Sequence, residues 1–216
     1  MAIALDLAST ISAQAATTSL TFAHTCTGSD RILFVYAGNI VASPNITGVT
    51  YNGVAMTEVG HAATQSNEFT YLWVLVAPAT GANNVVITAN ASSKIAGGAI
   101  SYTGAKQSAQ PDSFNTGVGV AATTLTVSTT VVASGCWLVG AGSTGNGTIA
   151  AGTGMTQRAN RAGDGTFDAA ITGDSNGTVA TGSQSLQITN GGADSIGLVV
   201  ASFAPAVSSS AFLTFM

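Results

Sequence analysis

The sequence has few charged and few aromatic residues, and the shortage of charge excludes a class of partner. Charged side chains make up 6% of the 216 residues, against about 25% in ordinary globular domains. Nucleic-acid binding needs clustered Lys and Arg to neutralise phosphates, whereas the net charge here is -4. We therefore expect neither DNA nor RNA as a partner. The five basic residues, which form no run, are Arg31, Lys94, Lys106, Arg158 and Arg161.

Long apolar runs are also missing, although the mean hydropathy is +0.41. The richest stretches, residues 32–41 and 196–207, are interrupted by polar residues or proline. Each is shorter than the roughly 20 apolar residues that a membrane-spanning helix needs. The first residues lack the basic segment of a signal peptide. We expect neither a membrane anchor nor export by the usual route.

Cysteine is scarce too, with only Cys26 and Cys136. Two thiols in a chain of this length do not make a disulfide framework. They are interpreted as two small buried hydrophobic residues, with a single bridge between them as the alternative.

What the sequence does contain is the periodicity of β-strands. In residues 19–24 and 124–128, apolar and small polar side chains alternate, which indicates strands with one buried face. Residues 32–36 and 71–76 are apolar on both faces and suit central strands. Hydrophobic residues make up 46% of the chain, so low charge does not indicate disorder.

Turn residues separate these runs. Asn52-Gly53 lies between two short apolar segments and predicts a hairpin, because a type I′ turn needs positive φ at both central residues. Further turns are expected at Asn146-Gly147, Asn176-Gly177 and Asn190-Gly191. Residues 2–16 are rich in alanine but lack an apolar stripe, so they are interpreted as an extended arm.

The two halves of the sequence also resemble one another. Residues 17–105 and 122–206 are interpreted as two copies of one strand set, joined by a linker over 107–120. We predict an all-β fold, a single jelly-roll-like β-sandwich of about 10–12 strands, with an arm at 1–16 and a tail at 207–216. Two separate small sandwiches are the alternative. The matching segments are 18–21 with 123–126 and 32–35 with 137–140 (offset 105), 53–57 with 152–156 (offset 99), and 87–90 with 188–190 and 100–105 with 201–206 (offset 101).

No set of residues predicts reaction chemistry, so we expect no enzyme, metal or cofactor. His24 and His61 are interpreted as structural. Residues 141–145 approach the nucleophile motif G-x-S-x-G but lack its first glycine. Residues 145–150 mimic a dinucleotide motif outside a βαβ unit and are interpreted as a glycine-rich hairpin loop. Asp164, Asp168 and Asp174 are too widely spaced for a calcium loop and are interpreted as solvated carboxylates.

The two ends are the candidate contact sites. A serine spacer, residues 208–210, precedes an apolar tail that could fold back on its own domain or insert in a neighbouring subunit. We expect partner contacts from the apolar residues of both ends: Ile3, Leu5, Leu7, Phe212, Leu213, Phe215 and Met216.

Several segments of the first half suggest a family. Residues 49–57 (VTYNGVAMT), 72–81 (LWVLVAPATG), 84–88 (NVVIT) and 100–105 (ISYTGA) resemble motifs of phage-encoded virion proteins. The second half carries degraded versions, and its Met155-Thr156 lacks the Tyr-Asn-Gly turn. The resemblance implies a β-sandwich exposed on a particle.

We therefore expect a virion protein that assembles in the host cytoplasm. The leading hypothesis is a capsid decoration or cement protein that stabilises a phage head through subunit contacts. Its partners would be copies of itself, with a trimer favoured, and other virion proteins such as the major capsid protein. The alternative is a tail or fibre module that binds host-surface glycans. Such modules use exposed aromatics, whereas Trp73 and Trp137 are expected in the core. A hydrolase is the third hypothesis.

Overall fold

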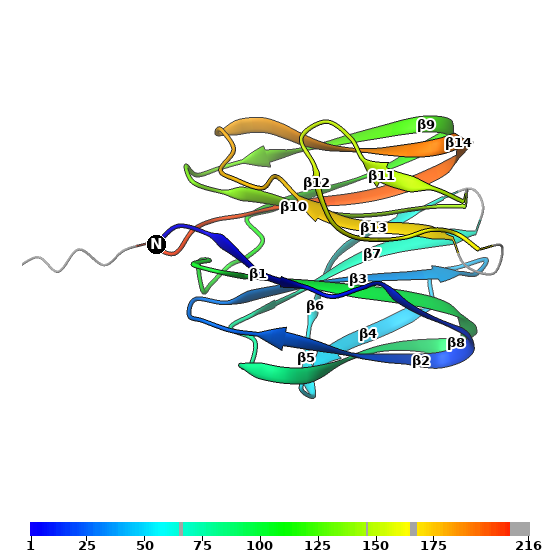
Figure 1. Cartoon of the computed structure of the whole chain (residues 1–216), viewed down its shortest axis with the longest axis horizontal. Helices are drawn as coiled ribbons and strands as arrows, with labels where there is room; N and C mark the ends of the chain where they lie inside the picture. Colours follow the sequence, from blue (N-terminus) through cyan, green and yellow to red (C-terminus); the bar gives the residue numbers. More distant parts are fainter. Residues whose placement is uncertain (65–66, 146, 165–167, 208–216) are drawn as a thin grey trace, which may run out of the picture.

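Two antiparallel β-sheets stack on one another in this computed structural model, which describes residues 1–64, 67–145, 147–164 and 168–207 (Figure 1). The described residues form fourteen strands and no helix, which confirms the predicted all-β sandwich and exceeds the expected 10–12 strands. The first sheet contains β1 (Ala4–Ala8), β2 (Ser12–Cys26), β3 (Ile32–Ile40), β4 (Ile46–Tyr51), β5 (Val54–Ala55), β6 (Thr57–Ala63), β7 (Glu68–Val76) and β8 (Gly81–Thr103).

The second sheet is built from the rest of the chain. Its longest strands are β9 and β14, which pair with one another along most of their length. None of the described residues forms an apolar helix long enough to cross a membrane. The strands are β9 (Ser113–Val131), β10 (Trp137–Thr144), β11 (Ile149–Ala151), β12 (Thr156–Arg161), β13 (Ala169–Asp174) and β14 (Gly182–Phe203).

The two sheets share one strand order. The first contains the path β4-β8-β3-β7-β6, and the second contains the path β11-β14-β10-β13-β12. Outside these paths, β2 pairs with the long strand β8 and β9 pairs with the long strand β14. Leu20 pairs with Ile87 in the first sheet, and Leu125 pairs with Ile188 in the second. These counterparts are 105 and 101 residues apart, the offsets at which the sequence segments match.

The correspondence between the two sheets extends to the β-bulges that interrupt their strand pairing. A bulge at Val59 in β6 has its counterpart in a bulge at Arg158 in β12. The first residue of β6 pairs with Val74 of β7, and the first residue of β12 pairs with Asp174 of β13. Val59 and Val74 therefore occupy the positions that Arg158 and Asp174 occupy in the second half.

Three hydrophobic clusters hold the molecule together. One is formed by the first sheet alone and one by the second alone, because each sheet curls around its own apolar face. The third lies between the sheets and includes both long strands, β8 and β14. Burial of a large apolar side chain stabilises the fold by about 1.5–3 kcal/mol. The rings at the centre of the third cluster are Phe34, Tyr102, Trp137 and Phe203, with centroids 4.8–6.3 Å apart.

Local predictions from periodicity and turns are confirmed. The predicted strands lie within β2, β3, β7 and β9, and Trp73 and Trp137 are buried. Asn52 and Gly53 have φ of 50° and 77° and join β4 to β5, as a type I′ turn requires. Asn146 lies outside the described residues.

Three other expectations are wrong. The segment expected as an arm pairs with β8, from Ala4 opposite Thr103 onward. The expected linker is mostly strand, because β9 begins at Ser113. Asn190-Gly191 is not a hairpin turn but lies inside β14, where the register with β9 shifts. In each case pairing with a long strand outweighs the local signal.

Candidate functional site

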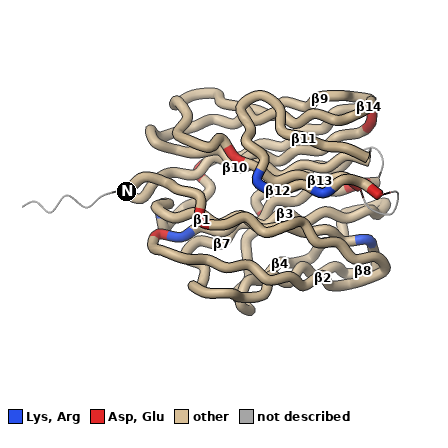
Figure 2. The backbone as a smooth tube through the Cα atoms, viewed as in Figure 1, with Lys and Arg blue, Asp and Glu red and all other residues tan. Residues whose placement is uncertain are grey.

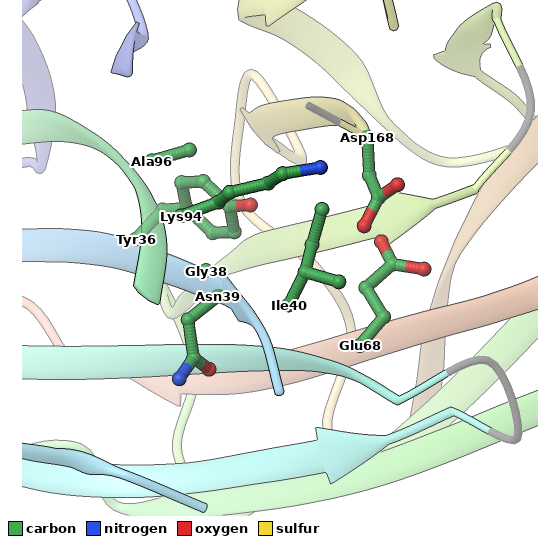
Figure 3. Close-up of a pocket in the computed structure, with 8 residues that line it drawn as sticks. All are labelled: Tyr36, Gly38, Asn39, Ile40, Glu68, Lys94, Ala96 and Asp168. Atoms are coloured by element: carbon green, nitrogen blue, oxygen red, sulfur yellow. The ribbon is translucent and has the colours of Figure 1, made fainter. Parts of the chain in front are cut away.

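A pair of carboxyl side chains, Glu68 and Asp168, lies where the two sheets meet. Glu68 is the first residue of β7, and Asp168 directly precedes β13, the counterpart of β7. The two acids therefore hold equivalent positions in the two halves. Figure 3 shows their carboxyl groups facing one another.

Glu68 is unusual because its carboxyl group is buried. It is 2% exposed, and the groups that act on its oxygens are the facing Asp168 carboxyl and the Ser143 hydroxyl. Burial raises the pKa of Glu68 to about 8, and the negative charge of Asp168 adds to the rise. Burial also raises the pKa of Asp168 to about 6, although the Lys94 ammonium opposes this. At neutral pH the pair therefore holds a proton, as closely spaced carboxyls do.

A small cavity adjoins the pair. Its volume is about 10 Å³, which is about the space of one water-sized particle. The Lys94 ammonium points across it toward Asp168 (Figure 3). A Cβ at Gly38 would overlap the Tyr36 hydroxyl, so glycine is needed here for Tyr36 to pack. The lining residues are Tyr36, Gly38, Asn39, Ile40, Glu68, Lys94, Ala96 and Asp168.

Uncharged polar groups also meet between the sheets. Thr70 of β7 and Ser143 of β10 share a buried hydrogen bond, and Ser143 is 1% exposed. Because a buried hydroxyl without a partner is costly, this bond fixes the alignment of the two sheets next to the carboxyl pair.

His24 belongs to a second polar cluster, with Ser101 and Asp6. His24 Nε2 lies 3.0 Å from Ser101 Oγ, and Ser101 Oγ donates to Asp6 Oδ2 at 2.8 Å. Nucleophilic catalysis places the histidine between serine and carboxylate, so that it takes the serine proton. Here the serine is in the middle and donates its hydrogen bond to Asp6. His24 must then donate to Ser101, so it cannot act as the base.

The burial of this cluster supports a structural role. Ser101 is 0% exposed and His24 is 2% exposed. Burial lowers the pKa of His24 to about 4, so the ring is neutral at pH 7. Asp6 lies in β1, His24 in β2 and Ser101 in β8. The cluster therefore fastens the first two strands to the sheet.

A buried ion pair forms the third polar group. Arg158 donates to both oxygens of Asp174, at 2.8 Å each. Asp174 is 0% exposed and also accepts a 2.8 Å hydrogen bond from the Tyr102 hydroxyl of the other sheet. Bidentate geometry with a further donor satisfies the carboxylate, so this group links the sheets without being available to a ligand.

The acids and cysteines singled out in the sequence lie in separate places. Asp164 forms an ion pair with Arg161 at 2.6 Å, whereas Asp168 lines the cavity and Asp174 binds Arg158. The expectation that all three are solvated carboxylates is wrong for Asp174, which is fully buried. Cys26 and Cys136 are buried free thiols that form no disulfide with one another.

The residues expected to contact a partner lie in different environments. Ile3 is 5% exposed and belongs to the core between the sheets, so it contacts the chain's own residues. Leu5 packs against the same core, whereas Leu7 is 41% exposed. The tail residues Phe212, Leu213, Phe215 and Met216 lie outside the described residues.

No three His, Cys, Asp or Glu side chains gather into a metal site in the part of the chain that the structure describes. Among the groups above, only Glu68 and Asp168 present carboxylate oxygens to a cavity. A cation there would bind two carboxylates and complete its coordination with water.

No local pattern in the sequence indicates the carboxyl pair, because its two members are 100 residues apart. The internal repeat contains the signal, since aligning β7 with β13 places Glu68 and Asp168 in one column. In comparisons with known proteins, no family model, curated protein or solved structure matches this chain.

Proposed function

We propose that this chain is a structural protein of a virus particle, a capsid decoration or cement protein that works through contacts with copies of itself and other virion proteins. The observation that supports this most directly is strand β9. It pairs with β14 on one side and has no strand partner on the other among the described residues. An open edge presents unpaired N–H and C=O groups to another chain. On β9 the Thr130 and Ser128 carbonyls are exceptions, because they accept hydrogen bonds from the Ser113 and Asn115 side chains of the same strand.

The chemistry of β9 favours contact rather than solvation. None of its 19 residues is charged, whereas exposed edges are normally protected by Lys, Pro or inward charges. Figure 2 shows the same absence of charge along β9. Phe114, Val118 and Val120 are 52%, 41% and 56% exposed. They share one face of the strand, because side chains alternate.

The first half has a matching edge. Strand β2, the counterpart of β9, pairs only with β8 among the described strands and contains no Lys, Arg, Asp or Glu. One chain therefore presents two uncharged edges at different places. Contacts between unlike edges generate closed rings when the rotation closes, which is compatible with a trimer.

The self-association part of the proposal is tested by measuring mass in solution. We expect the wild-type chain to form an oligomer, and Val118→Lys with Val120→Lys to reduce it toward the 21.2 kDa monomer. Val54→Lys is the matched control, since Val54 is 53% exposed on β5, away from the β9 edge. Light scattering after size exclusion gives the readout. A wild-type chain that stays monomeric at high concentration contradicts the oligomer.

The location is tested on purified virus particles with an antibody against this chain. Labelling of heads supports a decoration protein. Labelling confined to tails, together with binding on a glycan array, supports a tail or fibre module instead. Particles without the protein contradict both.

A further inference from the structure

We propose that Glu68 and Asp168 bind one hard divalent cation, of the calcium or magnesium class, between the two halves of the chain. The inference does not depend on the proposed function, because it concerns residues that lie between the sheets rather than on an outer edge.

The placement of the two carboxyl groups is the first observation that supports a cation. The carboxyl groups face one another from equivalent positions in the two halves (Figure 3). Glu68 is 2% exposed, and the groups that act on its oxygens are the facing Asp168 carboxyl and the Ser143 hydroxyl. Buried polar atoms in proteins are almost always partnered, so the two facing carboxyls either share a proton or, once both are ionised, hold a cation at the adjoining cavity.

The size of the cavity limits what that ligand can be. A space of about 10 Å³ has room for one ion or water molecule and none for an organic substrate. Calcium and magnesium prefer carboxylate oxygens, and magnesium is commonly held by one or two carboxylates with water in the other positions.

The surrounding charges favour a cation. Asp194 adds to the negative charge acting on Glu68 and on Asp168. Two basic side chains act on Asp168, Lys94 and Arg161. Arg161 is also engaged by Asp164 at 2.6 Å. Lys94 and Arg161 supply two positive charges against four acids, Glu68, Asp164, Asp168 and Asp194, so ionisation of the pair favours a further positive charge.

A proton is the competitor for the same oxygens, and this makes the proposal testable by pH. Cation binding requires both carboxyls to be ionised and therefore displaces the proton that they hold. Binding should be weak at pH 5.5 and stronger at pH 8. Lys94 is a second competitor, because its ammonium points into the same cavity.

The experiment measures the melting temperature of the full chain at pH 8 in excess EDTA and in millimolar CaCl2 or MgCl2. We expect one of these salts to raise Tm by about 5 °C, since a ligand that binds only the folded state stabilises it by mass action. Glu68→Gln and Asp168→Asn should lose this response. Glu58→Gln, which removes an acid of β6 distant from the cavity, should keep it.

Two further measurements separate a cation from a proton. The wild-type response should shrink at pH 5.5, and Lys94→Gln should bind the cation more tightly in calorimetric titration. If neither salt changes the wild-type Tm at pH 8, or if Glu68→Gln responds as the wild type does, the proposal is wrong. In that case the pair holds only a proton.

Discussion

Where the first half of the chain has Val59 and Val74, the second half has the ion pair Arg158–Asp174. Both pairs lie at the same bulge, in the same strand order. The two valines belong to the core between the sheets, whereas Asp174 is fully buried as a charged group. The strand order thus tolerates either chemistry, which indicates that alternation and pairing determine the topology.

The aromatic side chain that packs beside each pair is also polar in one case and apolar in the other. Tyr102 of the first half donates to Asp174. Its counterpart Phe203 has no hydroxyl and lies in the same apolar cluster as Val74. The differences between the halves are therefore coordinated: an apolar set on one side and a hydrogen-bonded ionic set on the other. A buried ion pair adds little net stability over an apolar pair, but it is costly to break.

The largest expected effect breaks the ionic set. Asp174→Ala leaves Arg158 and the Tyr102 hydroxyl without their acceptor, and we expect the free energy of unfolding to fall by roughly 3–5 kcal/mol. Val74→Ala, the matched change in the other half, should cost less, about 1–3 kcal/mol. Urea unfolding of the two variants measures both values. An equal or smaller loss in Asp174→Ala would contradict the difference between the halves.

The next effect concerns Glu68 and Asp168, the acids that hold equivalent positions in the two halves. The pKa of Glu68 in the folded chain, about 8, lies above the ordinary value of 4.5. The folded state therefore keeps a proton that the unfolded chain releases. The contribution of Glu68 to the free energy of unfolding is complete below pH 4.5 and is lost as the pH rises toward 8. Each unit of pKa difference corresponds to about 1.4 kcal/mol.

Glu68→Gln removes this titration. We expect the variant to keep a nearly constant free energy of unfolding from pH 6.5 to 8, where the wild type loses stability, and to exceed the wild type at pH 8. Unfolding in urea with EDTA present isolates the proton effect from any cation. A wild-type curve that rises over this range would contradict the expected direction.

The smallest effect is expected when the second half is made like the first. Arg158→Val, Asp174→Val and Tyr102→Phe together replace the ionic set by apolar groups. We expect stability within about 1 kcal/mol of the wild type or above it, because apolar replacement removes the desolvation cost of the charges. Thermal and urea unfolding test this against Asp174→Ala alone. A triple variant as unstable as that single variant would show that the halves are not interchangeable here.

Much of the fold follows from local pattern. Alternation identified the strands around Leu20 and Leu125, and Asn52-Gly53 identified a turn whose φ values only such residues adopt readily. Predictions failed where a long strand determines the conformation. Asn190-Gly191 carries a turn signal, yet β14 continues through it because it pairs with β9 and β11.

The candidate site was harder to predict. Glu68 and Asp168 meet through the packing of two sheets, which no window of the sequence contains. His24 is buried and hydrogen-bonded to Ser101, but its partners Ser101 and Asp6 come from β8 and β1 and could not be named from spacing. Whether the chain belongs to a virus particle stays a prediction.

The long strands β8 and β14 have a mechanical consequence. In the C-terminal part of each strand, one face packs in the cluster of its own sheet and the opposite face packs in the cluster between the sheets. Neither strand can slide along its axis without disturbing two sets of contacts at once. A load applied to one sheet therefore passes to the other through the apolar cluster in which both strands are packed.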